Sequence, residues 1–138
     1  WKSGNFADLV AHQLRHNERQ IIGLAARRDD MAAIRQLAPG ASIVRPASFS
    51  EFAGACSNLS HGLAMRYHAG LAMIRAGLPV KLAAYDTKVM ELATDAGIQI
   101  LQQNQVADFR QARPGFCTEN EARLQKMRAA FAAMLAQG

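Results

Sequence analysis

The sequence has 138 residues, which suggests one domain of about 100–200 residues with room for a hydrophobic core. Hydrophobic residues make up 50% of the chain and charged residues 20%, so we expect a globular domain and exclude a disordered tail. No apolar run approaches the roughly 20 residues that span a bilayer. The net charge of +5 is dispersed, whereas a nucleic-acid-binding module concentrates its basic residues on one helix or stripe.

The start of the chain gives no targeting signal. Trp1 is not an initiator methionine, and no apolar signal segment follows it. We therefore expect the sequence to be a piece of a longer protein.

The two cysteines, Cys56 and Cys117, are far apart and lie in no C-x-x-C pattern. One disulfide between them is chemically possible, but two unrelated buried thiols in a reducing cytoplasm are the preferred interpretation. A zinc site is excluded because the candidate ligands do not cluster in the sequence. No metal or organic cofactor is expected.

Short apolar runs alternate with amphipathic stretches along the whole chain, without a repeat or a linker. Helical spacing and continuous apolar runs distinguish the predicted helices from the predicted buried strands. In chain order we predict a helix over 6–16, a strand over 21–26, a helix closed by Pro39-Gly40, a strand over 42–44, a helix after Ser48, a weak strand over 58–63, a helix over 67–76 ending at Gly77, a strand over 78–84, a helix ending at Gly97, a strand over 98–101 and a long helix over 119–137.

Polar residues at the predicted helix starts support these boundaries. Asp29 or Asp30 is expected to cap the second helix, and Asp86 or Thr87 the helix that ends at Gly97. Ser48 is followed three residues later by a glutamate, which is a capping-box pattern. In the helix that ends at Gly97, we expect one apolar face formed by Val89, Met90, Leu92 and Ala93. In the long last helix, we expect an apolar stripe that packs into the core, formed by Leu124, Met127, Phe131, Met134 and Leu135.

Strands that alternate with helices predict a doubly wound α/β domain, with a mainly parallel sheet and helices on both faces. Ligands of such domains bind beyond the carboxyl ends of the strands, where helix N-termini present free N–H groups. The chain contains neither G-x-G-x-x-G nor G-x-x-x-x-G-K-[ST], so it gives no dinucleotide or P-loop signal.

Arg66 and His68 stand out because they fall at a predicted strand-to-helix junction. A guanidinium fork, an imidazole and a positive helix end together make an anion site with a group that can move a proton. The alternative is that Arg66 pairs with a carboxylate while His68 caps or packs in the first helical turn. On spacing alone this second interpretation is favoured.

A second group, Tyr85-Asp86-Thr87-Lys88, follows the next predicted strand. In a parallel sheet this loop is a neighbour of the Arg66 loop, so Lys88 could add positive charge to the same crevice. The alternative is that Asp86 is only an N-cap and Lys88 a solvated residue of the first turn.

The segment from Gly62 to Val89 resembles the C-terminal signature of polysaccharide pyruvyl transferases. Their pattern is Met-Arg-Leu-His, a helix, Gly-Val-Pro, a strand and Tyr-Asp-Pro-Lys-Val. Here it appears as Met65-Arg66-Tyr67-His68, Gly77-Leu78-Pro79 and Tyr85-Asp86-Thr87-Lys88-Val89. Tyr67 replaces the usual leucine and Thr87 the usual proline, so acceptor preference can differ, but no charged residue is lost. The strand–helix rhythm and the long last helix are also similar, and we expect the resemblance to cover most of the chain.

The resemblance implies a bacterial transferase of glycosyltransferase-B-like architecture, which moves the pyruvyl group of phosphoenolpyruvate to a sugar as a ketal in exopolysaccharide or cell wall synthesis. This chain would be one Rossmann-like domain over 1–138, the C-terminal donor-binding half, inactive alone. The polypeptide before Trp1 would supply the other half and the strand that leads into the first helix, and a sheet without that strand has a gap or an exposed edge. Dimerisation could compensate for it.

By the same resemblance Arg66 and His68 match residues that hold phosphoenolpyruvate. We expect Arg66 to bind carboxylate or phosphate, His68 to bind the donor and act as the general acid, and Lys88 to neutralise phosphate charge. The partners would be phosphoenolpyruvate and a glycan or lipid-linked sugar. The enzyme would work in the cytoplasm, with the inner face of the membrane as the more specific alternative.

Two other functions remain open: the donor half of a nucleotide-sugar glycosyltransferase, and a non-catalytic binding or assembly domain of the same fold. No acidic residue is placed convincingly to hold a ribose, which disfavours the first, and retention of Arg66 and His68 disfavours the second. His12 and His16 have metal-ligand spacing but no third ligand, so we interpret them as surface residues. His61 directly precedes the signature without a defined role.

Overall fold

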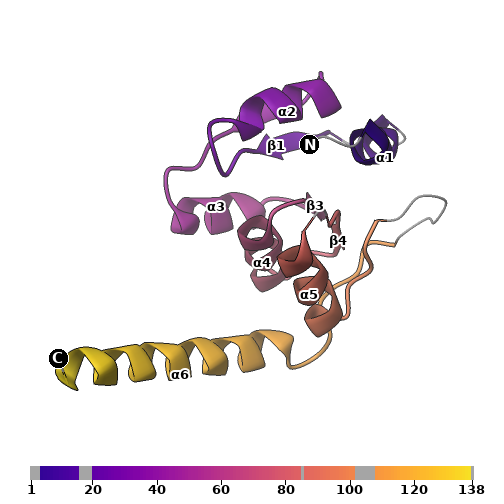
Figure 1. Cartoon of the computed structure of the whole chain (residues 1–138). Coiled ribbons are helices and arrows are strands. Elements are labelled where there is room, and N and C mark those ends of the chain that lie inside the picture. The colour runs from indigo at the N-terminus through magenta and orange to yellow at the C-terminus, as the bar shows by residue number, and fades with distance from the viewer. Residues whose placement is uncertain (1–3, 16–19, 85, 102–107, 138) are drawn as a thin grey trace.

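The computed structural model describes residues 4–15, 20–84, 86–101 and 108–137. These residues form a mixed α/β structure in which short parallel strands alternate with helices (Figure 1). Its elements are α1 (Gly4–Arg15), β1 (Ile22–Leu24), α2 (Asp30–Leu37), β2 (Ser42–Val44), α3 (Phe49–Cys56), β3 (Gly62–Ala64), α4 (Tyr67–Arg75), β4 (Val80–Leu82), α5 (Thr87–Ala96) and α6 (Phe116–Gln137).

Most helix boundaries follow from the local signals in the sequence. The Ser48 hydroxyl accepts a hydrogen bond from the Glu51 N–H at the start of α3, and the Glu51 carboxylate accepts one from the Ala47 N–H. Asp86 is the N-cap of α5, where its carboxylate accepts from the Val89 N–H. α5 ends at Gly97, whose φ of 67° is in the left-handed region that favours glycine.

The start of α2 differs from the predicted cap. Asp29 occupies the N-cap position, but its side chain makes no capping hydrogen bond. The neighbouring Asp30 carboxylate instead accepts a hydrogen bond from the Arg27 N–H at 2.8 Å. It therefore holds the loop that connects β1 to α2.

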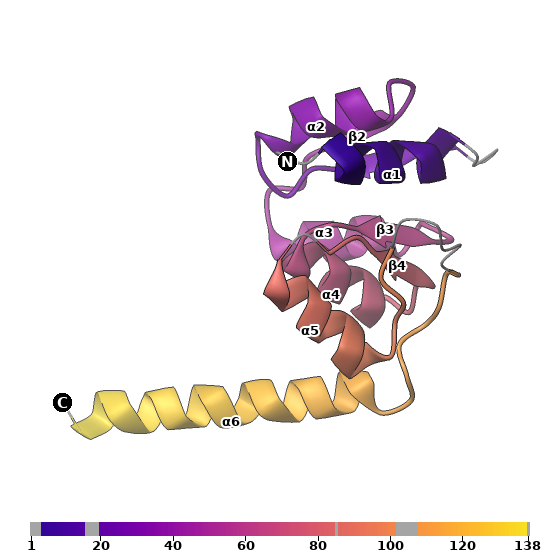
Figure 2. The same ribbon diagram turned by 45° about the vertical axis from the view of Figure 1, so that its right-hand side comes forward.

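The four strands form two separate parallel pairs instead of the single expected sheet. β1 pairs with β2, and β3 pairs with β4, but no hydrogen-bonded pairing joins β1 to β3 among the described residues. Figures 1 and 2 show the β1–β2 pair with α1 and α2 in one layer, next to a layer that contains β3, β4, α3, α4 and α5. The prediction of a strand over 98–101 was wrong in its length, because only an isolated parallel bridge between Ile100 and Leu82 forms there.

The main hydrophobic core lies between the β3–β4 pair and helices α3, α4 and α5. Gly70 lets α4 approach these elements, since a Cβ there would lie 2.9 Å from Leu82 and 3.2 Å from Leu92. A smaller cluster formed by Val10, Leu37, Ala83 and Leu101 connects α1 and α2 to the end of β4. The predicted apolar face of α5 is buried except for Met90, which is exposed.

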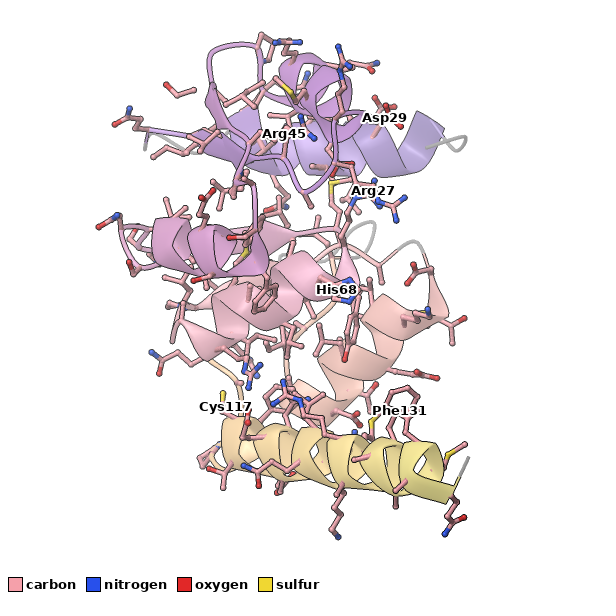
Figure 3. All side chains as sticks on the ribbon, turned by 90° about the vertical axis from the view of Figure 1, so that its left-hand side faces the viewer. Arg27, Asp29, Arg45, His68, Cys117 and Phe131 are labelled. Atoms are coloured by element: carbon pink, nitrogen blue, oxygen red, sulfur yellow. The ribbon has the colours of Figure 1, made fainter. Side chains whose placement is uncertain are left out.

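The long helix α6 does not pack into the core as its apolar stripe predicted. Phe116, its first residue, is buried, but Met127, Phe131, Met134 and Leu135 are 62–70% exposed, and Phe131 is visible on the helix in Figure 3. The reason is geometric: α6 touches the body only through its first turns and then extends past it (Figure 2).

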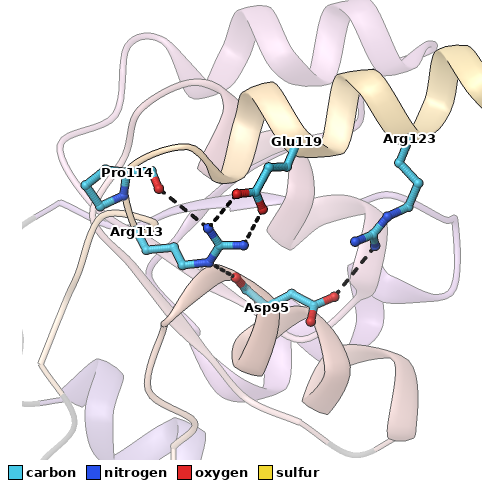
Figure 4. A network of polar contacts seen from close by, with 5 residues as sticks. All are labelled: Asp95, Arg113, Pro114, Glu119 and Arg123. Atoms are coloured by element: carbon cyan, nitrogen blue, oxygen red, sulfur yellow. Dashed lines mark hydrogen bonds and ion pairs between the residues drawn. The ribbon is translucent and has the colours of Figure 1, made fainter.

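Ion pairs hold those first turns of α6. The Arg113 guanidinium binds the Glu119 carboxylate at 2.5 Å and donates from Nε to the Asp95 carbonyl at 2.6 Å (Figure 4). Arg123 lies 3.8 Å from the Asp95 carboxylate. Arg75 of α4 pairs with Glu121 of α6. The Arg113 hydrogen bond lowers the pKa of the Glu119 carboxyl below its usual value.

The cysteines differ from the expectation of two buried thiols. Cys56 is buried at the end of α3, and burial raises the pKa of its thiol. Cys117 is exposed in the first turn of α6, next to the buried Phe116. In the part of the chain that the structure describes, no helix is both long and apolar enough to cross a membrane.

Candidate functional site

Arg66, His68 and Lys88 line the same cavity, which has a volume of about 820 Å³. Each of the four strands contributes the loop or helix start that follows it: residues 26–27 after β1, 46–49 after β2, 66–69 after β3, and Asp86 and Lys88 after β4. The cavity therefore lies at the carboxyl ends of the strands, where doubly wound domains bind their ligands.

Helix N-termini and cationic side chains meet at this cavity. His68 lies in the first turn of α4 and Lys88 in the first turn of α5, and the first residues of α3 also line the wall. The first N–H groups of a helix have no partner within the helix and carry partial positive charge. An anion in the cavity would meet both this charge and the side chains.

Arg66 is anchored by a carboxylate 36 residues earlier in the chain. Its Nε donates to both oxygens of Asp30, at 2.9 and 3.0 Å, and its Nη2 lies 2.5 Å from Oδ1. Asp30 is only 8% exposed. The carboxylate pairing foreseen as the alternative role of Arg66 is thus present, and it fixes the guanidinium at the edge of the cavity.

His68 is exposed to solvent, and its ring packs edge-on against Tyr67 with the centroids 5.3 Å apart. Tyr67 is half-buried against the main core. The Tyr67 ring therefore connects the imidazole to the core, while the imidazole itself stays accessible to a ligand.

Asp86 acts as the N-cap of α5, as its alternative interpretation predicted, and Lys88 is exposed in the first turn. Both nevertheless line the cavity. Tyr85, the first residue of that motif, lies outside the described residues.

Arg27 is a further cationic residue of the cavity and was not predicted from the sequence. It follows β1, and Figure 3 shows it on the same face of the molecule as His68. The only signal for it was a charged pair, Arg27-Arg28, directly after a predicted strand. Besides Asp86, the N-cap of α5, one other acidic residue among those described lines the cavity, namely Glu91.

A second cavity, of about 530 Å³, lies between β1 and β3 and contains an unforeseen lysine. Lys81 is only 8% exposed, its Nζ lies 3.2 Å from the Gln13 side-chain oxygen, and it sits 4.2 Å from the centroid of the Phe109 ring. Burial lowers the pKa of Lys81, and nearby Asp108 partly offsets that effect. His61 lines this cavity and not the one that contains His68.

Comparisons of the chain with protein-family models, with curated proteins and with solved structures found no match. The chemistry of the site therefore rests on its own residues.

The remaining histidines form no metal site in the described part of the chain. His12 is exposed on α1, and His16 lies outside the described residues. Among the described residues, no group of three or more His, Cys, Asp or Glu side chains could hold a metal ion.

Proposed function

We propose that the chain is the phosphoenolpyruvate-binding half of a pyruvyl transferase. The observation that carries this proposal is the convergence of Arg27, Arg66, His68 and Lys88 on one cavity at the carboxyl ends of the strands. The resemblance of residues 62–89 to the signature of that family selects the donor among possible anions.

The charge of the cavity suits the two anionic groups of phosphoenolpyruvate. Carboxylate and phosphate both accept paired hydrogen bonds from a guanidinium, and two guanidinium groups, those of Arg27 and Arg66, are present. Lys88 supplies a compact positive charge at the start of α5, which suits phosphate. The Asp30 carboxylate orients Arg66, so less side-chain freedom is lost when the donor binds.

The proposed transfer needs one proton donor. The methylene carbon of phosphoenolpyruvate gains a proton, which makes the adjacent carbon electrophilic. One sugar hydroxyl bonds to that carbon, the carbon–oxygen bond to phosphate breaks, and a second hydroxyl replaces it to close the ketal. Two hydroxyl protons are released, one of which balances the methylene proton while the other leaves with phosphate. His68 is the residue that gives the first proton.

The wider fold in this proposal is a doubly wound, glycosyltransferase-B-like half, a single Rossmann-like domain over 1–138. The partner half would bind the sugar acceptor, a glycan or lipid-linked sugar in exopolysaccharide or cell wall synthesis. The enzyme would act in the cytoplasm, at the inner face of the membrane where such acceptors are built.

A second candidate, the donor half of a nucleotide-sugar glycosyltransferase, is favoured by one observation. Glu91 lines the cavity, and a carboxylate near a phosphate site is the residue type that accepts hydrogen bonds from ribose hydroxyls. The two candidates differ in their donor, which makes them separable by binding.

Calorimetric titration of the chain with phosphoenolpyruvate and, separately, with uridine diphosphate tests the proposal. We expect phosphoenolpyruvate to bind, Arg66→Ala to abolish the binding, and Arg75→Ala to preserve it. Arg66 is the N-cap of α4 and Arg75 is the last residue of that helix. Arg75 is the matched control because it too pairs with a carboxylate but is not part of the cavity. Binding of uridine diphosphate alone would replace the proposal with the second candidate, and equal loss in both variants would refute the assignment of Arg66.

A further inference from the structure

The second cavity separates two strand edges that face each other. Residues 20–24, which contain β1, form one wall, and residues 58–66, which contain β3, form the opposite wall. Side chains of α1 and α2 also line it, among them Val10, Leu14 and Leu37, together with Lys81 of β4 and Phe109. Figures 1 and 2 show the β1–β2 and β3–β4 pairs as separate units in both views.

Backbone hydrogen bonds identify which groups of β1 point toward this cavity. The Ala25 N–H, directly after β1, donates to the Val44 carbonyl of β2 at 3.0 Å. In an extended chain, the backbone groups of successive residues point to alternate sides. Those of Ile22 and Leu24 therefore point away from β2, toward the cavity.

The backbone groups of β3 alternate between β4 and the cavity in the same way. The Gly62 N–H donates to the Pro79 carbonyl at 3.0 Å, and the Ala64 carbonyl accepts from the Ala83 N–H at 2.8 Å. The backbone groups of Leu63, between them, consequently point away from β4 and toward the cavity. Both walls thus present the polar edge of a parallel strand.

The connections between the elements show which strand belongs there. α2 joins β1 to β2, and α4 joins β3 to β4, and each connects two adjacent parallel strands. If α1 likewise connects two adjacent parallel strands, a strand before α1 lies beside β1. It lies on the free edge of β1, because β2 already occupies the other edge. In doubly wound sheets the first strand lies between the two outward-growing halves. The resulting order is β2, β1, the strand before α1, β3, β4.

We propose that the cavity between β1 and β3 is the seat of an additional parallel strand, supplied by the polypeptide that precedes α1. This strand joins the two pairs into one sheet and is covered on both faces, so it is apolar throughout. Its carboxyl end points toward Arg66 and Asp30, whose ion pair already connects the loops after β3 and β1.

Amide hydrogen exchange on three proteins tests the proposal. The first is the chain alone, and the second is the chain extended ahead of Trp1 by a designed strand of five valine and isoleucine residues with a short turn. The third has the same extension with two prolines within the strand. Proline removes the N–H donor and is excluded from central strands, so the third protein is the matched control.

We expect the first extension to slow exchange of the Ile22, Leu24 and Leu63 amides at least tenfold, with the protein monomeric. The Ala83 amide, already bonded to β3, should change less, and the proline extension should leave all four unchanged. Equal effects of the two extensions would overturn the proposal. So would slow exchange of the Ile22, Leu24 and Leu63 amides in the unextended monomer, because β1 and β3 would then pair directly. Slow exchange of these amides in an unextended dimer, lost on dilution, would also overturn it, because a second copy would then fill the cavity.

Discussion

His68 and Lys88 occupy the same position, the second residue, of two consecutive helices that follow two adjacent parallel strands. The β3–α4 and β4–α5 units therefore deliver their side chains to the same cavity. This relationship places an imidazole and an ammonium group at the positive ends of two helices.

Replacing His68 with Ala in the full-length protein is expected to abolish pyruvyl transfer, because the proposed proton donor is removed. The melting temperature should stay within about 2 °C of the wild-type value, since an exposed side chain contributes little to stability. Product formation from phosphoenolpyruvate is the measurement. His12→Ala, which changes an exposed histidine outside the cavity, is the matched control. A fully active His68→Ala protein would remove His68 from the mechanism.

Arg66→Ala should lower the free energy of unfolding by about 1–3 kcal/mol, because the buried Asp30 carboxylate loses its partner. Arg75→Ala breaks an exposed ion pair and should cost less than about 1 kcal/mol. Urea denaturation measures both values. In a double-mutant cycle with Asp30→Ala, the two effects should be strongly non-additive. Additive effects would show that the ion pair contributes nothing to the fold.

Lys81 should make stability rise with pH in the alkaline range. Burial lowers its pKa in the folded state, so between that value and the unfolded value of about 10.4 the unfolded chain binds more protons. Below the folded pKa the cost of burying the charge is fully present, and it is lost as the pH rises through this window. We expect the stability of the wild-type protein relative to Lys81→Met to increase between pH 7 and pH 10. A pH-independent difference would mean that Lys81 is solvated.

Two phenylalanines on α6 provide a direct test of its exposed face. Phe116→Ala removes a buried ring and should cost about 3–5 kcal/mol, whereas Phe131→Ala should change the free energy of unfolding by no more than about 0.5 kcal/mol. Chemical denaturation distinguishes these values readily. A large cost at Phe131 in the monomer would show that the far half of α6 packs on the body after all.

The sequence predicted those elements whose boundaries depend on local chemistry. Ser48 and Asp86 cap their helices through their own side chains, and Gly97 ends α5 because it adopts a positive φ. These interactions span three or four residues, so the pattern alone contains them. Parallel strand pairing was also predictable, because helices separate the strands.

Features that depend on long-range contacts could not be predicted in the same way. The apolar period of α6 shows which face is apolar but not what covers it, so the stripe around Phe131 was misinterpreted as core. Asp30 was assigned only as a helix cap, and its pairing with Arg66 joins residues 36 positions apart. Arg27 reaches the cavity only through the arrangement of β1 beside β2, which a charged dipeptide does not reveal.

The most direct test of the account is a nuclear magnetic resonance titration of the isotope-labelled chain with phosphoenolpyruvate. We predict saturable shifts of the His68 ring, the Arg66 Nε–Hε and the backbone N–H groups at the starts of α4 and α5, with α1 and α6 unchanged. Shifts centred instead on Lys81 and His61, in the other cavity, would contradict the proposed site.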